Sequence, residues 1–286
     1  MLQVEGLTKY YGKNRGVHDL CLEVRAGEIL GLLGPFGAGK TTALRCIMDL
    51  TSKDGGEVLL NGRRFDRRTP KMRAMVGYLP AESALYPGLR VGDVLRLHSR
   101  YYRSVDETYL GRLIRRLEID IARRVRELTP AGCRKLNIVL ALMHRPALIL
   151  MDEAAAGLDP LTQEALFSLL REERERGAAV LYASGSLSEV RRLCDRAAIL
   201  RDGEIAVTDE VGNLVNGDVH LVTLECADAG VAQRLGSSAI EREGDVTRFL
   251  YEGEPDALIK ELSGVRVRRL LVEEPSLEDV LDHLFQ

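Results

Sequence analysis

Gly34-Pro35-Phe36-Gly37-Ala38-Gly39-Lys40-Thr41, with Thr42 directly after it, is the most informative segment of this sequence. It has the spacing Gly-x-x-x-x-Gly-Lys-Ser/Thr and lies between a predicted strand over 28–33 and a predicted helix over 42–50. Glycines let the backbone approach phosphates, and the N–H groups at a helix N-terminus attract them. Lys40 would neutralise the β- and γ-phosphates, and the Thr41 hydroxyl would hold Mg²⁺. The segment therefore predicts a loop that binds Mg-ATP, with a glycine-rich turn that binds nothing as the alternative.

A second motif is Leu148-Ile-Leu-Met-Asp152-Glu153, a predicted buried strand that ends in two acids. At that edge of a sheet Asp152 would lie beside the phosphate loop and orient Mg²⁺ through its water shell. Glu153 would then position the attacking water as a general base. Many strands end in an acid, so a helix cap or a solvated carboxylate is the alternative for this pair. The phosphate loop favours the catalytic interpretation.

Around these motifs, short apolar segments alternate with helical segments. Strands are predicted over the ranges 17–24, 28–33, 57–60, 147–151, 178–183 and 197–200. Asp159-Pro160 supplies a cap and a first-turn proline for one helix, and Ser186-x-x-Glu189 predicts a capping box for another. This alternation is typical of βαβ units, so we expect an α/β fold of the P-loop NTPase class with a mainly parallel sheet.

Two departures from the alternation suggest the domain organisation. From about 84 to 145 the apolar period is helical, which predicts a helical subdomain inserted into the sheet. After about residue 210 the predicted order is β-α-β-β-α-β-α, ending in a helix over 276–284, which favours a small ferredoxin-like accessory domain. We therefore expect an ATP-binding domain over 1–210 and an α+β domain over 211–286.

Composition excludes several other classes of protein. The 286 residues are 45% apolar and carry a net charge of −3, which argues against disorder and against a dedicated nucleic-acid binder. Five cysteines and five histidines are scattered without the spacing of a metal cluster. The N-terminus is too polar for a signal peptide, and no apolar run approaches the ~18–20 residues that span a bilayer. A soluble cytoplasmic chain without a transmembrane segment is expected.

Together, the motifs resemble the ATP-binding subunit of an ABC transporter, of the type that drives exporters with separate membrane subunits. The similarity covers about residues 1–210, and Glu274–Leu281 resembles the end of those exporters' accessory domain. The resemblance implies that Tyr11 stacks on adenine, although its alternative is an ordinary surface aromatic. It places the lateral glutamine loop at Gly77–Glu82 and the signature loop at Leu128–Cys133.

The same resemblance implies a set of partners. Thr129 and Ala131 of the signature loop, with Asp159 of the segment Ala156–Asp159, would face a second ATP-binding subunit, in a homodimer or a heterodimer. A transmembrane permease subunit would hold this dimer at the cytoplasmic face of the membrane as a peripheral protein. ATP and Mg²⁺ are the implied cofactors, and no nucleic acid is implied.

Several positions depart from the family's pattern. Phe36 replaces the usual Asn or Ser, and Ala81 stands where a Gln or Glu would contact Mg²⁺, with Glu82 one residue out of place. Pro130 lacks an N–H, and Ala131 lacks the freedom of glycine. Ala154-Ala155 replace the usual Pro-Thr after the catalytic acid. Gly185 occupies the place of the switch histidine.

These departures leave two functions open. The first is an ATPase motor with slow hydrolysis, which the intact Lys40, Thr41, Asp152, Glu153 and Asp159 favour. The second is a nucleotide-binding regulatory or paired subunit with little or no turnover, which the substituted loops favour.

Overall fold

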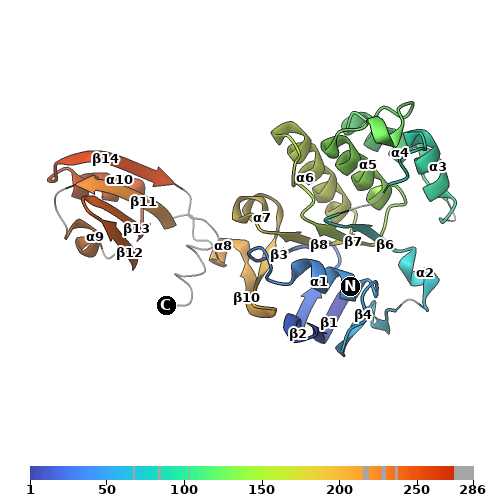
Figure 1. Cartoon of the computed structure of the whole chain (residues 1–286), viewed down its shortest axis with the longest axis horizontal. Helices are drawn as coiled ribbons and strands as arrows, with labels where there is room; N and C mark the ends of the chain where they lie inside the picture. Colours follow the sequence, from blue (N-terminus) through green and yellow to red (C-terminus); the bar gives the residue numbers. More distant parts are fainter. Residues whose placement is uncertain are drawn as a thin grey trace. The chain divides into compact units, whose positions relative to one another are not determined.

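The computed structural model describes residues 1–66, 68–82, 85–102, 104–214, 219–226, 230–235 and 238–273 of the chain (Figure 1). It divides into two compact units, Met1–Asp209 and Glu210–Gln286. Within those described ranges, no helix is long and apolar enough to cross a membrane.

The first unit is built on a six-stranded sheet in the order β10-β9-β3-β8-β7-β6. Its strands are β3 (Ile29–Leu33), β6 (Val76–Leu79), β7 (Leu148–Asp152), β8 (Ala179–Ser184), β9 (Arg196–Arg201) and β10 (Glu204–Glu210). The neighbours from β9 through β3, β8 and β7 to β6 are parallel. Every residue of β3, β7 and β8 is buried, as expected for central strands covered on both faces. The motifs that follow β3 and β7 therefore emerge at the same edge of the sheet.

A second sheet in this unit is antiparallel, in the order β2-β1-β4-β5. Its strands are β1 (Leu2–Tyr11), β2 (Asn14–Val24), β4 (Gly55–Leu60) and β5 (Arg63–Arg64). The sequence analysis did not predict β1, because its apolar alternation breaks between Val4 and Leu7, where the pairing with β2 shifts register. Gly6, at φ +59°, lies at this break. Strands β6 and β10 were also missed, the first because it is short and the second because polar residues alternate along its exposed edge.

Helix α1 (Lys40–Ile47) lies between the two sheets and contacts β1, β2, β7 and β8. Its buried Ala43, Leu44 and Ile47 join apolar side chains from both sheets in one hydrophobic core. Because the core fixes both α1 and β3, the loop between them has a defined conformation. That loop is the predicted phosphate loop.

The remaining helices of the first unit are α2 (Pro70–Arg73), α3 (Val91–Ser99), α4 (Glu107–Arg116), a 3₁₀ turn (Val125–Glu127), α5 (Pro130–Leu142), α6 (Pro160–Glu175) and α7 (Leu187–Leu193). In Figure 1, α3, α4 and α5 gather as one helical group, and α3 and α4 both contact α5. Helix α5 also contacts β6. The first turn of α5 is therefore held near the carboxyl edge of the main sheet.

The second unit contains a four-stranded antiparallel sheet in the order β12-β13-β11-β14. Its elements are α8 (Val211–Leu214), β11 (Val219–Cys226), α9 (Val231–Arg234), β12 (Ser238–Glu243), β13 (Val246–Glu252), α10 (Pro255–Leu262) and β14 (Val267–Glu273). From β11 onward this is the β-α-β-β-α-β sequence of a split βαβ fold. Val222, Phe249 and Leu258 lie in its own apolar core. The helix expected over 276–284 and the segment Glu274–Leu281 lie outside the described residues.

Candidate functional site

The phosphate loop joins β3 to α1 and places Lys40 at the first residue of the helix. Gly37 and Gly39 have φ of +84° and +108°, and a Cβ at Gly39 would collide with the Gly16 carbonyl, so a side chain there is excluded. The Lys40 side chain is only 7% exposed. Its Nζ donates to the carbonyls of Gly34 (2.6 Å) and Pro35 (3.1 Å). The ammonium is thus held inside the loop.

A cavity of about 300 Å³ opens over this loop. It is lined by Phe36, Gly37, Ala38, Gly39, Lys40, Thr41, Thr42, Ala81 and Glu153. The Phe36 side chain is fully exposed, so its ring lies at the rim of the cavity and leaves the space over the loop open. Of the predicted phosphate-binding residues, Gly34 and Pro35 act through their carbonyls on Lys40 and do not line the cavity.

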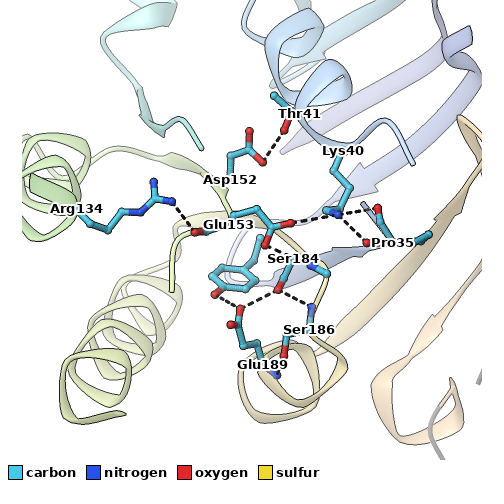
Figure 2. A network of polar contacts seen from close by, with 12 residues as sticks. Pro35, Lys40, Thr41, Arg134, Asp152, Glu153, Ser184, Ser186 and Glu189 are labelled. Carbon is cyan, nitrogen blue, oxygen red and sulfur yellow. Dashed lines mark hydrogen bonds and ion pairs between the residues drawn. The ribbon is translucent and has the colours of Figure 1, made fainter. Parts of the chain in front are cut away.

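Asp152, the last residue of β7, is fully buried beside the loop. Thr41 Oγ1 donates to Asp152 Oδ1 at 3.2 Å (Figure 2). The other oxygen, Oδ2, is buried without a hydrogen-bond partner among the described residues. Burial raises the pKa of Asp152, the Thr41 hydrogen bond opposes this, and the charge of Glu153 adds to it. Such a desolvated carboxylate oxygen next to a hydroxyl suits a divalent cation with oxygen ligands.

Glu153 follows β7 directly, and its carboxylate lies between two elements of the site (Figure 2). Oε1 forms an ion pair with Lys40 Nζ at 3.2 Å, and Oε2 accepts from the Gly185 N–H at 3.4 Å. The Glu153 backbone has φ +49°, which is uncommon for a residue other than glycine. Its N–H donates to the Ala183 carbonyl of β8 at 2.9 Å. The structure therefore brings together the residues predicted for phosphate, metal and water.

Tyr11 lies at the end of β1, with its side chain half exposed. A Cβ placed on Gly16 would lie 3.0 Å from both Tyr11 and Thr42, so the ring and helix α1 meet at Gly16. Lys9 Nζ lies 5.6 Å from the ring centroid. Tyr11 is thus next to the phosphate-loop helix, with an open face.

The chain is similar to proteins that contain this kind of site. A family model described as ABC transporter matches residues 17–156. The Nod factor export ATP-binding protein I of Cupriavidus pinatubonensis is 32% identical over 290 residues, which cover 98% of this chain and 89% of that protein. The linearmycin resistance ATP-binding protein LnrL of Bacillus subtilis is 31% identical, covering 97% and 96%. The chain belongs to the ATP-binding subunits of ABC transporters.

Solved structures agree with this assignment. The structure of an ATP-binding subunit of an ABC transporter is 28% identical and superposes with a TM-score of 0.71, covering 75% of this chain and 91% of that one. A dimeric bacterial ABC transporter cassette, 23% identical, has the same fold, with a TM-score of 0.67 over 74% and 99% of the two chains. The predicted α/β class with a P-loop NTPase core is confirmed.

The loop predicted as the signature loop leads into α5, and we call this part of the molecule the signature side. Thr129 is the N-cap of α5, and its hydroxyl accepts from the Gly132 N–H at 3.1 Å. A second cavity of about 300 Å³ lies beside it, lined by Ala81, Pro130, Ala131, Cys133, Arg134, Asn137, Ala156 and Gly157. Asp159 caps α6, accepting from Thr162, and these hydrogen bonds lower the pKa of Asp159. Ala81 lines both cavities, so the two sides of the site adjoin within one chain.

The backbone conformation at residue 185 does not require glycine. Its φ is not among the left-handed values. A Cβ there would lie 3.6 Å from the Gly34 carbonyl and 3.8 Å from both Glu153 Oε1 and Lys40 Nζ, which are ordinary contacts. A side chain at 185 would therefore point into the site without collision.

The capping box predicted at Ser186 and Glu189 is only half formed. Ser186 Oγ accepts from the Glu189 N–H, but the Glu189 carboxylate accepts from Tyr182 (2.7 Å) and Ser184 (2.8 Å) instead of from the Ser186 N–H (Figure 2). The buried Tyr182 and Ser184 hydroxyls need an acceptor, and Glu189 is the one available. Glu189 thus supports the segment that carries Gly185.

Arg134 is a residue of the site that the sequence analysis missed. It donates to the Pro80 carbonyl at 2.8 Å and to the Glu153 carbonyl at 2.9 Å, and Figure 2 shows the second of these hydrogen bonds. No local signal could have found it, because both acceptors are backbone carbonyls far away in the sequence.

Proposed function

We propose that this subunit binds Mg-ATP and hydrolyses it slowly to drive export through a separate membrane subunit. The observation that carries the proposal is that Lys40, Thr41 and Glu153 line one cavity, and that the buried Asp152 accepts a hydrogen bond from Thr41 beside it. In phosphoryl transfer, catalysis comes mainly from positioning and from charge stabilisation, and these four residues supply both.

Mg²⁺ is the proposed metal. Thr41 Oγ1 and Asp152 would hold it, directly or through its water shell, because the buried Asp152 Oδ2 has no partner in the described chain. When bound, the ion would neutralise charge on the phosphates. In this chain Lys40 binds phosphate, Tyr11 contacts adenine and Glu153 accepts a proton from the attacking water.

Lys40 and Glu153 neutralise each other before nucleotide binds, at 3.2 Å. An arriving phosphate competes with Glu153 for the ammonium, because it is the more highly charged anion. Glu153 is then released from Lys40 and retains the Gly185 N–H. In this way the site converts a resting ion pair into a free general base.

Slow turnover is expected because polar side chains are absent at positions 81 and 185 of the site. Gly185 offers only its backbone N–H, which is already directed at Glu153. Ala81 lines the cavity with a methyl group where a polar side chain would reach the metal or its water. ATP affinity depends on the loop, Lys40 and the metal, so it should be near normal.

A dimer and a membrane partner complete the proposal. The curated relatives are named for Nod factor export and linearmycin resistance, so an export function is the best-supported role. The exposed signature loop, with Thr129 and Ala131, and the Asp159 segment would face a second ATP-binding subunit. A permease would place this dimer at the cytoplasmic face of the membrane as a peripheral subunit.

The second candidate is a nucleotide-binding regulatory subunit without turnover. Pro130 at the first turn of α5 favours it, because proline removes an N–H from the helix end that would meet the phosphates of a partner's ATP.

Single-turnover and steady-state ATPase assays on the purified protein, with and without its permease, separate the two. The motor requires Mg²⁺-dependent phosphate release that Glu153→Gln removes. If ATP binds but phosphate release stays at the level of Glu153→Gln, both with and without the permease, the regulatory role would be established.

A further inference from the structure

The Arg134 side chain joins three parts of the subunit that differ in sequence position. It starts from α5, in the helical part, and is half buried. One Nη group donates to Pro80, just after β6, and the other donates to Glu153, just after β7. Strands β6 and β7 are parallel neighbours, so their carboxyl ends lie side by side. A single guanidinium thus spans both strand ends and the signature helix.

Arginine is suited to this contact, and lysine is not. A guanidinium is a rigid planar fork whose two Nη groups can donate to two separate acceptors at once. A lysine ammonium concentrates its charge at one point on a flexible stem, and would reach one of the two carbonyls. Burial lowers the pKa of Arg134 while Asp152 and Glu153 raise it, and the group stays charged at any working pH.

The Glu153 carbonyl is a sensitive place for such a contact. Glu153 has φ +49°, a conformation that persists only where the surroundings enforce it. Its N–H is bound by Ala183, and its carbonyl accepts from Arg134 and from the Ala156 N–H at 3.1 Å. Removing Arg134 leaves the turn from Glu153 to Ala156 with one donor fewer. The Glu153 carboxylate, which belongs to the same residue as this carbonyl, would then lose its fixed direction.

We propose that Arg134 is a positioning residue, which aligns Glu153 and the start of the lateral loop with the signature helix. Movement of α5 is transmitted through the guanidinium to the Pro80 and Glu153 carbonyls together. The catalytic acid is therefore placed correctly only when α5 is seated against the sheet. This inference rests on the proposed role of Glu153 as the general base.

The test compares Arg134→Lys and Arg134→Met with Arg116→Lys and Arg116→Met. Arg116 is the matched control, since its guanidinium also makes two contacts, to Glu172 and Ser168 of α6, away from both cavities. For Arg134→Met, kcat should fall about 10- to 100-fold, because small misplacements of a reacting group have effects of that size. KM for ATP should change by less than about 3-fold, as expected for an interaction that acts on the transition state. Arg134→Lys should fall between wild type and Arg134→Met.

A second readout does not depend on turnover. Hydrogen exchange of peptides covering 153–158 should be faster in Arg134→Met than in wild type, because the Glu153 carbonyl that accepts from the Ala156 N–H is no longer held in place by Arg134. Arg116→Met should leave these peptides unchanged. If the wild type hydrolyses no ATP, the proposed function fails, and exchange still decides the role of Arg134. Unchanged exchange and kcat in Arg134→Met, or equal losses in the Arg116 variants, would overturn the inference.

Discussion

The phosphate side and the signature side of this site differ in how their key residues are held. On the phosphate side, Lys40 and Asp152 are buried, and each is fixed by named hydrogen bonds. On the signature side, Pro130 and Ala81 provide neither charge nor a polar side chain, and Gly185, which lies next to Lys40 and Glu153, offers no side chain either. The phosphate side acts on bound nucleotide and on the transition state alike, whereas the missing groups would act mainly in the transition state. The difference supports the proposal that this subunit binds ATP normally and hydrolyses it slowly.

The largest expected effect comes from breaking the phosphate side. Lys40→Ala should abolish the thermal stabilisation that Mg-ATP gives the protein. A ligand at about 100 times its Kd stabilises the native state by about 2.7 kcal/mol, and this amount should disappear. Differential scanning fluorimetry with increasing ATP measures it. Lys260→Ala, an exposed lysine paired with Asp256 in the second unit, is the control. ATP stabilisation that survives in Lys40→Ala would remove the basis for the phosphate side.

The next effect isolates turnover from binding. Glu153→Gln keeps the size of the side chain and one of its two acceptor oxygens but removes the base, so ATP affinity should persist. Turnover should fall by about 10²–10⁴-fold if Glu153 is the general base. Phosphate release measures this, and size-exclusion chromatography should show an ATP-dependent dimer that accumulates in the variant. Glu164→Gln, at an exposed ion pair of α6, is the control. An unchanged rate would place catalysis, if any, at another residue.

These predictions were within reach of the sequence because they depend on local spacing and on parallel strands. The loop before α1 follows β3 and the acids follow β7, two buried parallel strands with β8 between them, and the carboxyl ends of such strands lie at one edge of the sheet. The position of Thr41 beside Asp152 follows from that rule. The side of the site that would face a partner was marked only by resemblance.

The rest depends on tertiary contacts that leave no local pattern. Arg134 finds two carbonyls far away in sequence, and backbone acceptors carry no residue identity. Glu189 had the spacing of a capping box, but two buried hydroxyls bind its carboxylate instead. Strand β1 was hidden by a register shift near Gly6. For Arg134 and Glu189 the hydrogen-bonding needs of polar groups decided the outcome, and for β1 an irregular strand pairing did.

A third experiment attempts to remove the difference between the two sides. Gly185→His restores a donor at a position with room for a Cβ and without left-handed strain. Donors aimed at developing charge contribute roughly 2.7–4 kcal/mol in the best-studied sites, so an increase in kcat of about 10-fold or more is expected. KM should change less than kcat, as for an interaction made in the transition state. Single-turnover kinetics measures the chemical step.

Gly264→His is the control for this experiment, because a Cβ there meets nothing within 4 Å in the second unit. A fast wild-type enzyme would contradict the comparison directly. So would a well-folded Gly185→His protein whose kcat stays at the wild-type level.

The smallest expected effect tests whether the signature side lacks catalytic groups or is loosely packed. Helix α5, which begins at this side, ends near His144, whose ring stacks on Tyr102 with centroids 3.9 Å apart. Burial lowers the pKa of His144 to about 4, the Val76 hydrogen bond opposes this, and His98 adds to it. An unfolded histidine binds its proton near pH 6.5, so between these values the unfolded state binds more protons. Stability should therefore fall as the pH drops from about 6.5 toward about 4, by at most about 1.4 kcal/mol per unit from this residue.

Urea unfolding between pH 7.5 and 4.5 measures this dependence, and His144→Phe should flatten it while keeping a ring against Tyr102. At pH 7.5 His144 is neutral, so no buried charge weakens its packing beyond the end of α5. Slow hydrolysis at that pH would then arise from the donor groups that Ala81, Pro130 and Gly185 do not provide. If the free energy of unfolding of His144→Phe depends on pH as steeply as that of wild type, a neutral His144 does not anchor α5. Loose packing of this helix would then be the explanation for slow turnover.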